Sequence, residues 1–254
     1  MLDTFKIWLR QGKQYIPDVT AVNLPDTFAN GSPIISETIS GDEARLVAAL
    51  CPTEAINPNP FSIDLGKCVF CNECSRALGK DKIKFTNDYK TATNIRERLI
   101  IRSGQNEPIK LDANAVRKEI HQFFGSSLKL RQISAGGDTS AEWELNATDN
   151  VNFDIGRWGI DFVASPRHAD GIVITGPLSA NMAEAVQICY DAVPNPKIII
   201  LVGTDAISGG IFAGSKALNR DFLDKYPIDL YVPGNPPHPL TFINGVLDLI
   251  KKRK

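Results

Sequence analysis

The sequence predicts an α/β protein in which a small cysteine-bearing α+β part precedes a doubly wound parallel sheet. Four of the five cysteines lie between residues 51 and 74, among many turn residues. After residue 127, short runs rich in Val, Ile and Leu alternate with helical patterns, which is typical of parallel strands covered on both faces. Shifts in composition indicate three parts: residues 1–90, a helical connector at 91–127, and residues 128–254.

The first two parts contain two clear helical patterns. The run GDEARLVAAL predicts a short helix over residues 41–50, directly before Cys51 and Pro52, and an apolar β segment follows. In the connector, DANAVRKEIHQFF is amphipathic over residues 112–124, and Asp112 is a candidate N-cap for that helix.

The third part alternates strands and helices. Strands are predicted at LKLRQIS, GIVITG, KIIILVG and DLYVPG, and helices at NMAEAVQICY and TFINGVLDLI. Because sites in such sheets gather after the carboxyl ends of the strands, we expect one in the loops SAGGDTSAE, TGPLS, GTDAISGG and PGNPPHP. The glycine-rich GTDAISGG is not a phosphate loop, because it lacks the G-K-[ST] ending.

Charge and hydropathy restrict the function. A formal net charge of -1 gives no reason to expect a nucleic acid partner. No apolar run is long enough to span a bilayer, and the chain opens with a short amphipathic stretch that contains Lys6 and Arg10 rather than a signal peptide. We therefore expect a cytoplasmic protein whose thiols stay reduced and available to a metal.

The cysteine spacing indicates one complete ligand set for a [4Fe-4S] cluster. Residues 68–74 read CVFCNEC, which is C-x2-C-x2-C, but Leu78 stands where a fourth cysteine should follow. A second run retains only its final Cys51-Pro52; its upstream positions hold Gly41, Ala44 and Val47. In paired runs the fourth cysteine ligates the cluster of the other run. The surviving cysteines therefore belong to one site: Cys51, Cys68, Cys71 and Cys74.

Two alternatives remain for these cysteines, a zinc knuckle or free thiols. Zinc sites usually pair two C-x2-C hooks, and only the second run supplies such hooks here. The fifth cysteine, Cys189, lies at helical spacing and is interpreted as an ordinary buried thiol.

The loops of the third part carry a resemblance to a known family. In order and spacing, SAGGDTSAEWEL, FVASPRHADGIVITGP, VGTDAISGGIFAGS and YVPGNPPHP resemble the small cluster-bearing subunit of respiratory complex I and of energy-converting [NiFe] hydrogenases. The N-terminal part resembles their two-cluster ferredoxin-like subunit. The resemblance implies a fusion of two neighbouring subunits, with a ferredoxin-like domain followed by a flavodoxin-like domain.

In that family the C-terminal domain holds a terminal [4Fe-4S] cluster on four cysteines. The resemblance places those four positions on residues that are not cysteines: Asp138, Ala141, Asp205 and Asn235. Since a cubane needs thiolates at nearly every corner, the terminal cluster is predicted to be missing.

Two uses of the vacated pocket are open. The oxygens of Asp138, Glu142, Asp205 and Asn235 could hold a divalent cation or share a proton. Alternatively, these side chains fill the cavity with water and hydrogen bonds.

Three further residues stand at family-typical positions outside the four ligand positions. We expect His168 and His238 to be structural or interface residues, and Arg167 to contact the large subunit.

The resemblance implies a peripheral subunit of a membrane assembly, on the inner face of the cell membrane, bound to a large subunit and to membrane subunits. With two clusters lost, the remaining cluster is predicted to be structural or redox-sensing rather than to complete electron transfer to quinone or nickel-iron, without catalytic activity of its own. The first alternative is electron exchange between this cluster and an external partner. The second, a free-standing flavodoxin-like enzyme that binds a nucleotide, has little support from these loops.

Overall fold

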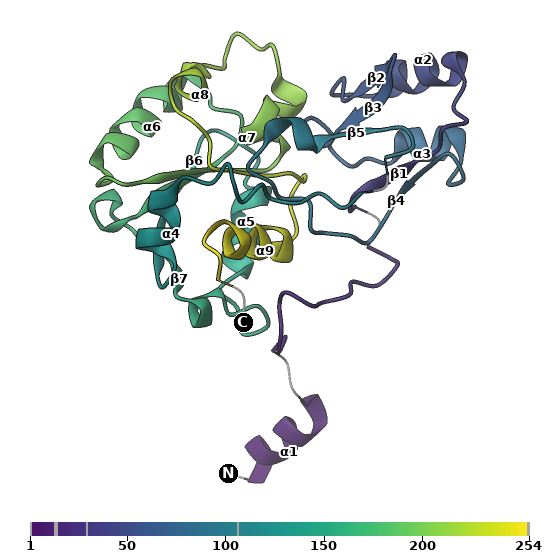
Figure 1. The fold of residues 1–254 in the computed structure, drawn as a ribbon. Helices are drawn as coiled ribbons and strands as arrows, with labels where there is room; N and C mark the ends of the chain where they lie inside the picture. The colour runs from purple at the N-terminus through teal and green to yellow at the C-terminus, as the bar shows by residue number, and fades with distance from the viewer. Residues whose placement is uncertain (1, 13–14, 29, 106, 253–254) are drawn as a thin grey trace.

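The structure is a computed structural model that describes residues 2–12, 15–28, 30–105 and 107–252. It contains a larger α/β unit, a smaller unit packed beside it, and a helix, α1 (Leu2–Gln11), that projects from the body (Figure 1). Among the described residues, no helix is long and apolar enough to cross a membrane.

The smaller unit is built from two small antiparallel sheets and two helices. Its elements are β1 (Pro33–Ile35), α2 (Gly41–Leu50), β2 (Ile56–Pro58), β3 (Phe61–Asp64), α3 (Glu73–Leu78), β4 (Ile83–Phe85), the 3-10 helix η1 (Arg96–Leu99) and β5 (Ile100–Arg102). Strand β1 pairs with β4, while β3 lies between β2 and β5.

Helix α2 covers Gly41, Ala44 and Val47, the positions that the cysteine spacing assigns to the incomplete run. The helix begins at the predicted residue because Ser40 forms a capping box with Glu43. Ala44 and Val47 are 2% and 0% exposed and contribute to the hydrophobic core. These positions therefore lie on a regular helix that packs on the core.

The predicted helix over residues 112–124 is wrong in its first half. Helix α4 (Lys118–Phe124) begins six residues later, after an extended Arg117. The Asp112 side chain accepts hydrogen bonds from the backbone of Asn114 and from Arg98, and so stabilises a turn instead of capping a helix. The connector also contains β5, which joins the sheet of the smaller unit. The predicted domain boundaries stay a prediction.

The larger unit contains the predicted parallel sheet. Its strands are β6 (Leu128–Ser134), β7 (Ile160–Phe162), β8 (Gly171–Thr175), β9 (Ile198–Val202) and β10 (Leu230–Val232), in the spatial order β10-β9-β8-β6-β7. Every neighbouring pair is parallel. This is the flavodoxin-like order, and the sequence pattern missed only the short edge strand β7.

Both faces of the sheet are covered, as predicted. On β8, Ile172 and Ile174 belong to one core cluster and Val173 to another, so alternate residues face opposite sides. Helices α6 (Ala180–Ala192) and α8 (Asp221–Lys225) contribute to the first cluster, while α4, α5 (Ser140–Ala147) and α9 (Pro239–Leu249) contribute to the second. The smaller unit also packs into the first cluster, so the two units share one hydrophobic core.

Candidate functional site

The C-x2-C-x2-C segment forms a loop between β3 and α3. Phe70 and Asn72 have φ angles of 54° and 62°, so the backbone turns through left-handed conformations between successive cysteines. Cys68 and Cys74 are buried, whereas Cys71 is exposed.

All four predicted ligands line a single cavity. Cys51 is the C-cap of helix α2 and lines the cavity together with the loop cysteines, and apolar side chains such as Val47, Ile63 and Phe85 complete the walls. Leu78, the missing fourth position of the second run, packs against the core instead. The structure thus brings Cys51, which is distant in sequence, next to the loop.

The surroundings of these sulfurs suit an iron-sulfur cluster. The backbone N–H groups of Ala55 and Phe70 donate hydrogen bonds of 3.3 Å to the Sγ atoms of Cys51 and Cys68, and such bonds tune cluster potentials. Burial, and then the neighbouring thiols, raises the pKa of Cys74 to about 11 and raises the pKa of Cys68 further. Buried thiols of this kind become thiolates only beside a compensating positive charge, which iron supplies.

The four cysteines line one cavity, and a cubane takes four thiolate ligands. Within the described ranges, no group of three or more His, Cys, Asp or Glu side chains is arranged to hold one metal ion.

A second, smaller pocket lies at the carboxyl ends of the strands. It is lined from all four predicted loops, by residues that include Gly137, Asp138, Ala141, Glu142, Gly176, Asp205, Gly234 and Asn235. The order in which successive strands are added to the sheet reverses direction between β6 and β8. Parallel sheets of this kind bind ligands at such a reversal, which is called the topological switch point. At that point a Cβ atom on Gly137 would lie 2.8 Å from Cα of Gly176, so the two loops can approach only without side chains.

Two of the three acidic side chains of this pocket, those of Asp138 and Glu142, accept hydrogen bonds from protein groups. Asp138 accepts hydrogen bonds from the backbone N–H and the hydroxyl of Ser140, at 2.9 and 2.6 Å, and these lower its pKa. Glu142 accepts a 2.7 Å hydrogen bond from the buried Thr175 hydroxyl. Burial raises the pKa of Asp205, and the charges of Asp138 and Glu142 add to that effect, while Arg220 opposes it. These contacts favour the water and hydrogen-bond alternative over a cation.

Arg220 joins the loop after β8 to helix α7 beside the pocket, and no pattern in the sequence indicates this role. Its guanidinium donates hydrogen bonds of 2.8 to 3.2 Å to the carbonyls of Pro177, Asp205, Ala206 and Ile207. Burial lowers its pKa from the usual value for arginine, and the charge of Asp205 opposes that shift.

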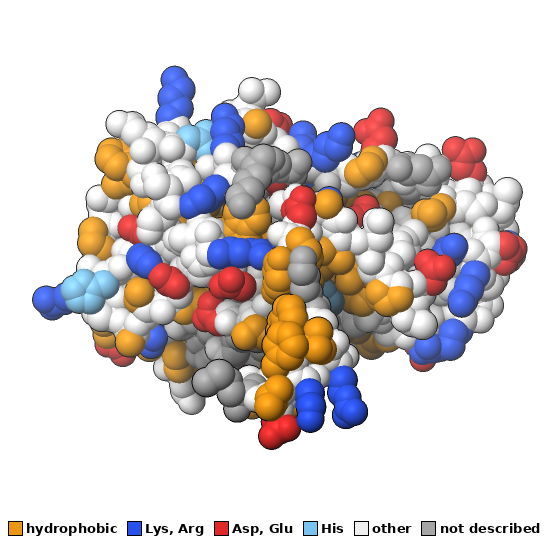
Figure 2. All heavy atoms as spheres, turned by 90° about the horizontal axis from the view of Figure 1, so that it is seen from below, with side chains coloured by type: hydrophobic (Ala, Val, Ile, Leu, Met, Phe, Trp, Pro, Cys, Tyr) orange, Lys and Arg blue, Asp and Glu red, His pale blue; other side chains and the backbone are white. Residues whose placement is uncertain are grey.

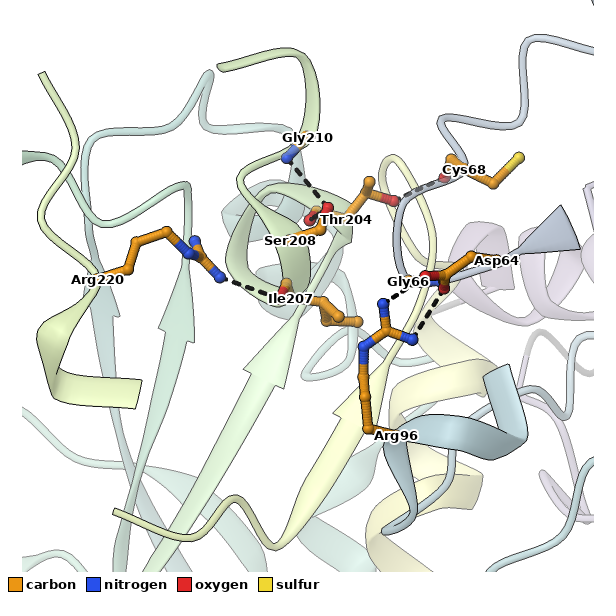
Figure 3. Close-up of polar contacts among 9 residues, drawn as sticks. All are labelled: Asp64, Gly66, Cys68, Arg96, Thr204, Ile207, Ser208, Gly210 and Arg220. Carbon is orange, nitrogen blue, oxygen red and sulfur yellow. Dashed lines mark hydrogen bonds and ion pairs between the residues drawn. The ribbon is translucent and has the colours of Figure 1, made fainter. Parts of the chain in front are cut away.

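Thr204, on the first turn of α7 (Thr204–Ser208), contacts a residue of the cysteine loop (Figure 3) and a residue of the carboxylate pocket. Its hydroxyl lies 2.8 Å from the Cys68 carbonyl and 3.1 Å from the Gly234 carbonyl. Thr204 therefore joins the cysteine loop to the wall of the carboxylate pocket.

The remaining predicted residues lie outside both pockets. Arg167 and His168 are exposed on a short 3-10 helix, η3 (Pro166–His168). His238 is the N-cap of α9: its Nδ1 accepts a hydrogen bond from the Leu240 backbone, Phe28 and Phe153 pack against its ring, and burial lowers its pKa. The His238 side chain thus has a structural role.

The fifth cysteine, Cys189, is predicted to be an ordinary buried thiol, but it is only half-buried on α6, where it packs against the core. Burial raises the pKa of its thiol, and the charge of Arg131 opposes this effect.

Comparison with known proteins gives one family for the larger unit. The family model described as "NADH ubiquinone oxidoreductase, 20 Kd subunit" matches residues 139–249. A probable membrane-bound hydrogenase subunit of Pyrococcus furiosus is 32% identical over 134 residues, which cover 53% of this chain and 80% of that protein. An NADH-quinone oxidoreductase subunit of Clostridium beijerinckii is 39% identical over 172 residues, which cover 67% of this chain and 93% of that protein.

A solved structure also matches. A chain of the membrane-bound sulfane sulfur reductase, an archaeal respiratory membrane complex, aligns with 29% identity and a TM-score of 0.44. The alignment covers 50% of this chain and 70% of that chain.

Proposed function

Because this chain belongs to the family of the NADH ubiquinone oxidoreductase 20 kDa subunit, we propose that it is a peripheral subunit of a membrane assembly related to complex I and to energy-converting hydrogenases. In this proposal the smaller unit is a ferredoxin-like domain fused to the family domain. The pairing of β1 with β4, and the two short helices that overlap the positions of the two cysteine runs, support that assignment.

The smaller unit holds one [4Fe-4S] cluster on Cys51, Cys68, Cys71 and Cys74. The observation that carries this proposal is that these four sulfurs line one cavity although Cys51 is distant from the others in sequence. When bound, the cluster accepts and returns one electron. The protein supplies buried thiols, backbone N–H donors to two sulfurs and an apolar wall that limits water.

The larger unit holds no terminal cluster. Two carboxylates, an amide and a methyl group stand at the four positions, and none of them is a thiolate. The subunit therefore does not complete electron transfer to a quinone or to nickel-iron, and it has no catalytic activity alone. In this proposal its cluster either stabilises the fold by cross-linking α2 to the cysteine loop, or acts as a redox sensor.

The loops of the carboxylate pocket face the large subunit, with Arg167 and His168 near that contact. The assembly lies on the inner face of the cell membrane, and membrane subunits hold this chain there. Helix α1 is a further contact in this proposal, because none of its residues is buried and its apolar side chains form a patch with basic side chains at the edge (Figure 2).

One observation favours a second candidate, electron exchange with an external redox protein. Cys71 is exposed, so one corner of the cluster site reaches the protein surface. Rapid oxidation of the reduced cluster by a soluble ferredoxin, with no other subunit present, would support this candidate.

Metal analysis of the native complex tests the main proposal. We expect about four irons and four sulfides per chain. Cys51→Ser should lose iron and lower the melting temperature, because the cluster no longer ties α2 to the loop, whereas Cys189→Ser should keep both. A content near eight irons, or zinc in place of iron, would overturn the proposal.

A further inference from the structure

Thr204 is a buried hydroxyl placed between two carbonyl acceptors. The residue is 0% exposed, and its Oγ1 lies 2.8 Å from the oxygen of Cys68 (Figure 3). The same Oγ1 lies 3.1 Å from the oxygen of Gly234. A hydroxyl has only one proton to donate. The two carbonyls therefore compete for a single hydrogen bond, and the torsion of the hydroxyl decides between them.

The competing carbonyls belong to different sites. Cys68 is a ligand in the cysteine cavity, while Gly234 lines the carboxylate pocket. The Gly234 carbonyl also accepts a 2.8 Å hydrogen bond from the backbone N–H of Thr204. It thus stays satisfied when the hydroxyl turns away, and the change between the two arrangements costs little.

The structure around Thr204 is fixed, so the hydroxyl is the part that is free to respond. A Cβ atom on Gly66 would lie 2.8 Å from Ile207 and from Arg96, which indicates close packing of the cysteine loop against α7. Arg96 forms a bidentate ion pair with Asp64, at 2.8 and 2.6 Å, and Asp64 accepts a hydrogen bond from the Gly66 backbone. These contacts hold the loop at a constant distance from Thr204.

We propose that Thr204 is a redox-responsive hydrogen-bond switch between the two pockets, an inference that rests on the cluster in the proposed function. An electron added at the cysteine site increases the negative charge around Cys68, so its carbonyl attracts the hydroxyl proton more strongly. The hydroxyl then turns from Gly234 to Cys68, and removal of the electron reverses the change. No covalent bond breaks and no proton leaves the protein. The oxidation state of the cluster is thereby transmitted to the wall that Asp205 and Gly234 share.

Two substitutions at Thr204 separate the hydrogen bond from the shape of the side chain. Thr204→Val removes the hydroxyl and nearly keeps the shape, whereas Thr204→Ser keeps the hydroxyl. Ser208→Ala is the matched control, because it removes another hydroxyl of α7, one that donates to the Thr204 carbonyl and does not reach the cluster loop. The full chain is titrated with dithionite and the reduced cluster is followed by electron paramagnetic resonance.

The midpoint potential is the first measurement. Loss of the hydroxyl donor makes the cluster harder to reduce. Thr204→Val should therefore lower the equilibrium constant for reduction by up to about tenfold, which is a fall of about 59 mV in the midpoint potential of a one-electron couple. Thr204→Ser and Ser208→Ala should keep the wild-type potential. If the wild type and the three variants all retain their iron and have equal midpoint potentials, the proposed switch is wrong, whereas the proposed function is unaffected.

Hydrogen exchange at the backbone amides of residues 203–210 and 234–238 is the second measurement. Exchange should differ between oxidised and reduced protein in the wild type and in Thr204→Ser, and this difference should be absent in Thr204→Val. If Thr204→Val fails to fold, the wild type and Thr204→Ser still decide the question, since the absence of any redox-dependent difference in them contradicts the switch. Wild-type protein without iron would overturn the proposed function, and the switch with it.

Discussion

At the scale of residues, Asp138, Ala141, Asp205 and Asn235 line one pocket of the structure. The strand pattern predicts that their loops meet at one edge of the sheet, because the loops follow the carboxyl ends of parallel strands, whereas the family resemblance selects these four residues within the loops. Arg220 and Thr204 could not be predicted in this way. Their roles depend on carbonyl groups in distant segments, and no local pattern encodes such contacts.

The two pocket aspartates should respond to pH in opposite directions. The folded-state pKa of Asp205 is raised, so its ionisation destabilises the fold as pH rises from about the unfolded pKa through the folded pKa. Asp205→Asn should therefore raise the melting temperature at pH 7 by no more than about 2–4 °C, which is the effect of about 1 kcal/mol in a chain of this size. The gain should shrink as the pH falls through the folded pKa, and it should vanish below the unfolded pKa, where the carboxyl is protonated in both states.

Asp138 provides the matched contrast, because its folded-state pKa is lowered and its ionised form stabilises the fold above the unfolded pKa. Asp138→Ala should lower the melting temperature at pH 7, and the loss should shrink as pH falls through the folded pKa. Calorimetric scans from about pH 2 to about pH 8 check both variants, because the range must extend below the unfolded pKa of an aspartate. A fall in melting temperature for Asp205→Asn at pH 7 would contradict this interpretation of the pocket.

At the scale of elements, strands and helices with strong patterns were predicted well and the connector was not. Helices α2, α6 and α9 carry sustained apolar spacing, and α2 also has a capping box. Residues 112–117 share the apolar spacing, but Asp112 offers its side chain to a turn and to Arg98. Side-chain hydrogen bonds thus override the helical periodicity there.

Restoration of the lost cysteine run should fail to restore a second cluster. Gly41, Ala44 and Val47 now lie on one regular helix, and Ala44 and Val47 are packed in the core. A variant with cysteine at these three positions and at Leu78 should keep about four irons per chain rather than about eight. It should also unfold more easily than Leu78→Cys alone, since three residues of a capped helix are altered. A doubling of iron and sulfide in the variant would show that α2 can still convert to a binding loop.

At the scale of the whole molecule, the two units share one core while α1 lies outside it. The sequence pattern indicated separate parts, but it could not show that the cysteine loop packs against α7, because this packing joins segments more than a hundred residues apart. Phe5 and Trp8 on α1 are 56% and 61% exposed, which is unusual for large apolar side chains.

Phe5→Ser with Trp8→Ser should reduce recovery of the chain with the membrane assembly without a change in its melting temperature. The reason is that neither side chain contributes to the core. Val151→Ser, at a residue of the body that is 69% exposed, is the control and should leave recovery unchanged. Quantitative co-purification from membranes measures the effect, and full recovery of the double variant would exclude α1 as an assembly contact.

The central claim is that this chain holds one iron-sulfur cluster in the cysteine cavity and none in the carboxylate pocket. Anomalous diffraction at the iron edge from crystals of the native complex tests it most directly, because it locates iron independently of any activity. We predict iron density beside Cys51, Cys68, Cys71 and Cys74, and none among Asp138, Ala141, Asp205 and Asn235. Iron density in the carboxylate pocket, or its absence from the cysteine cavity, would contradict the account.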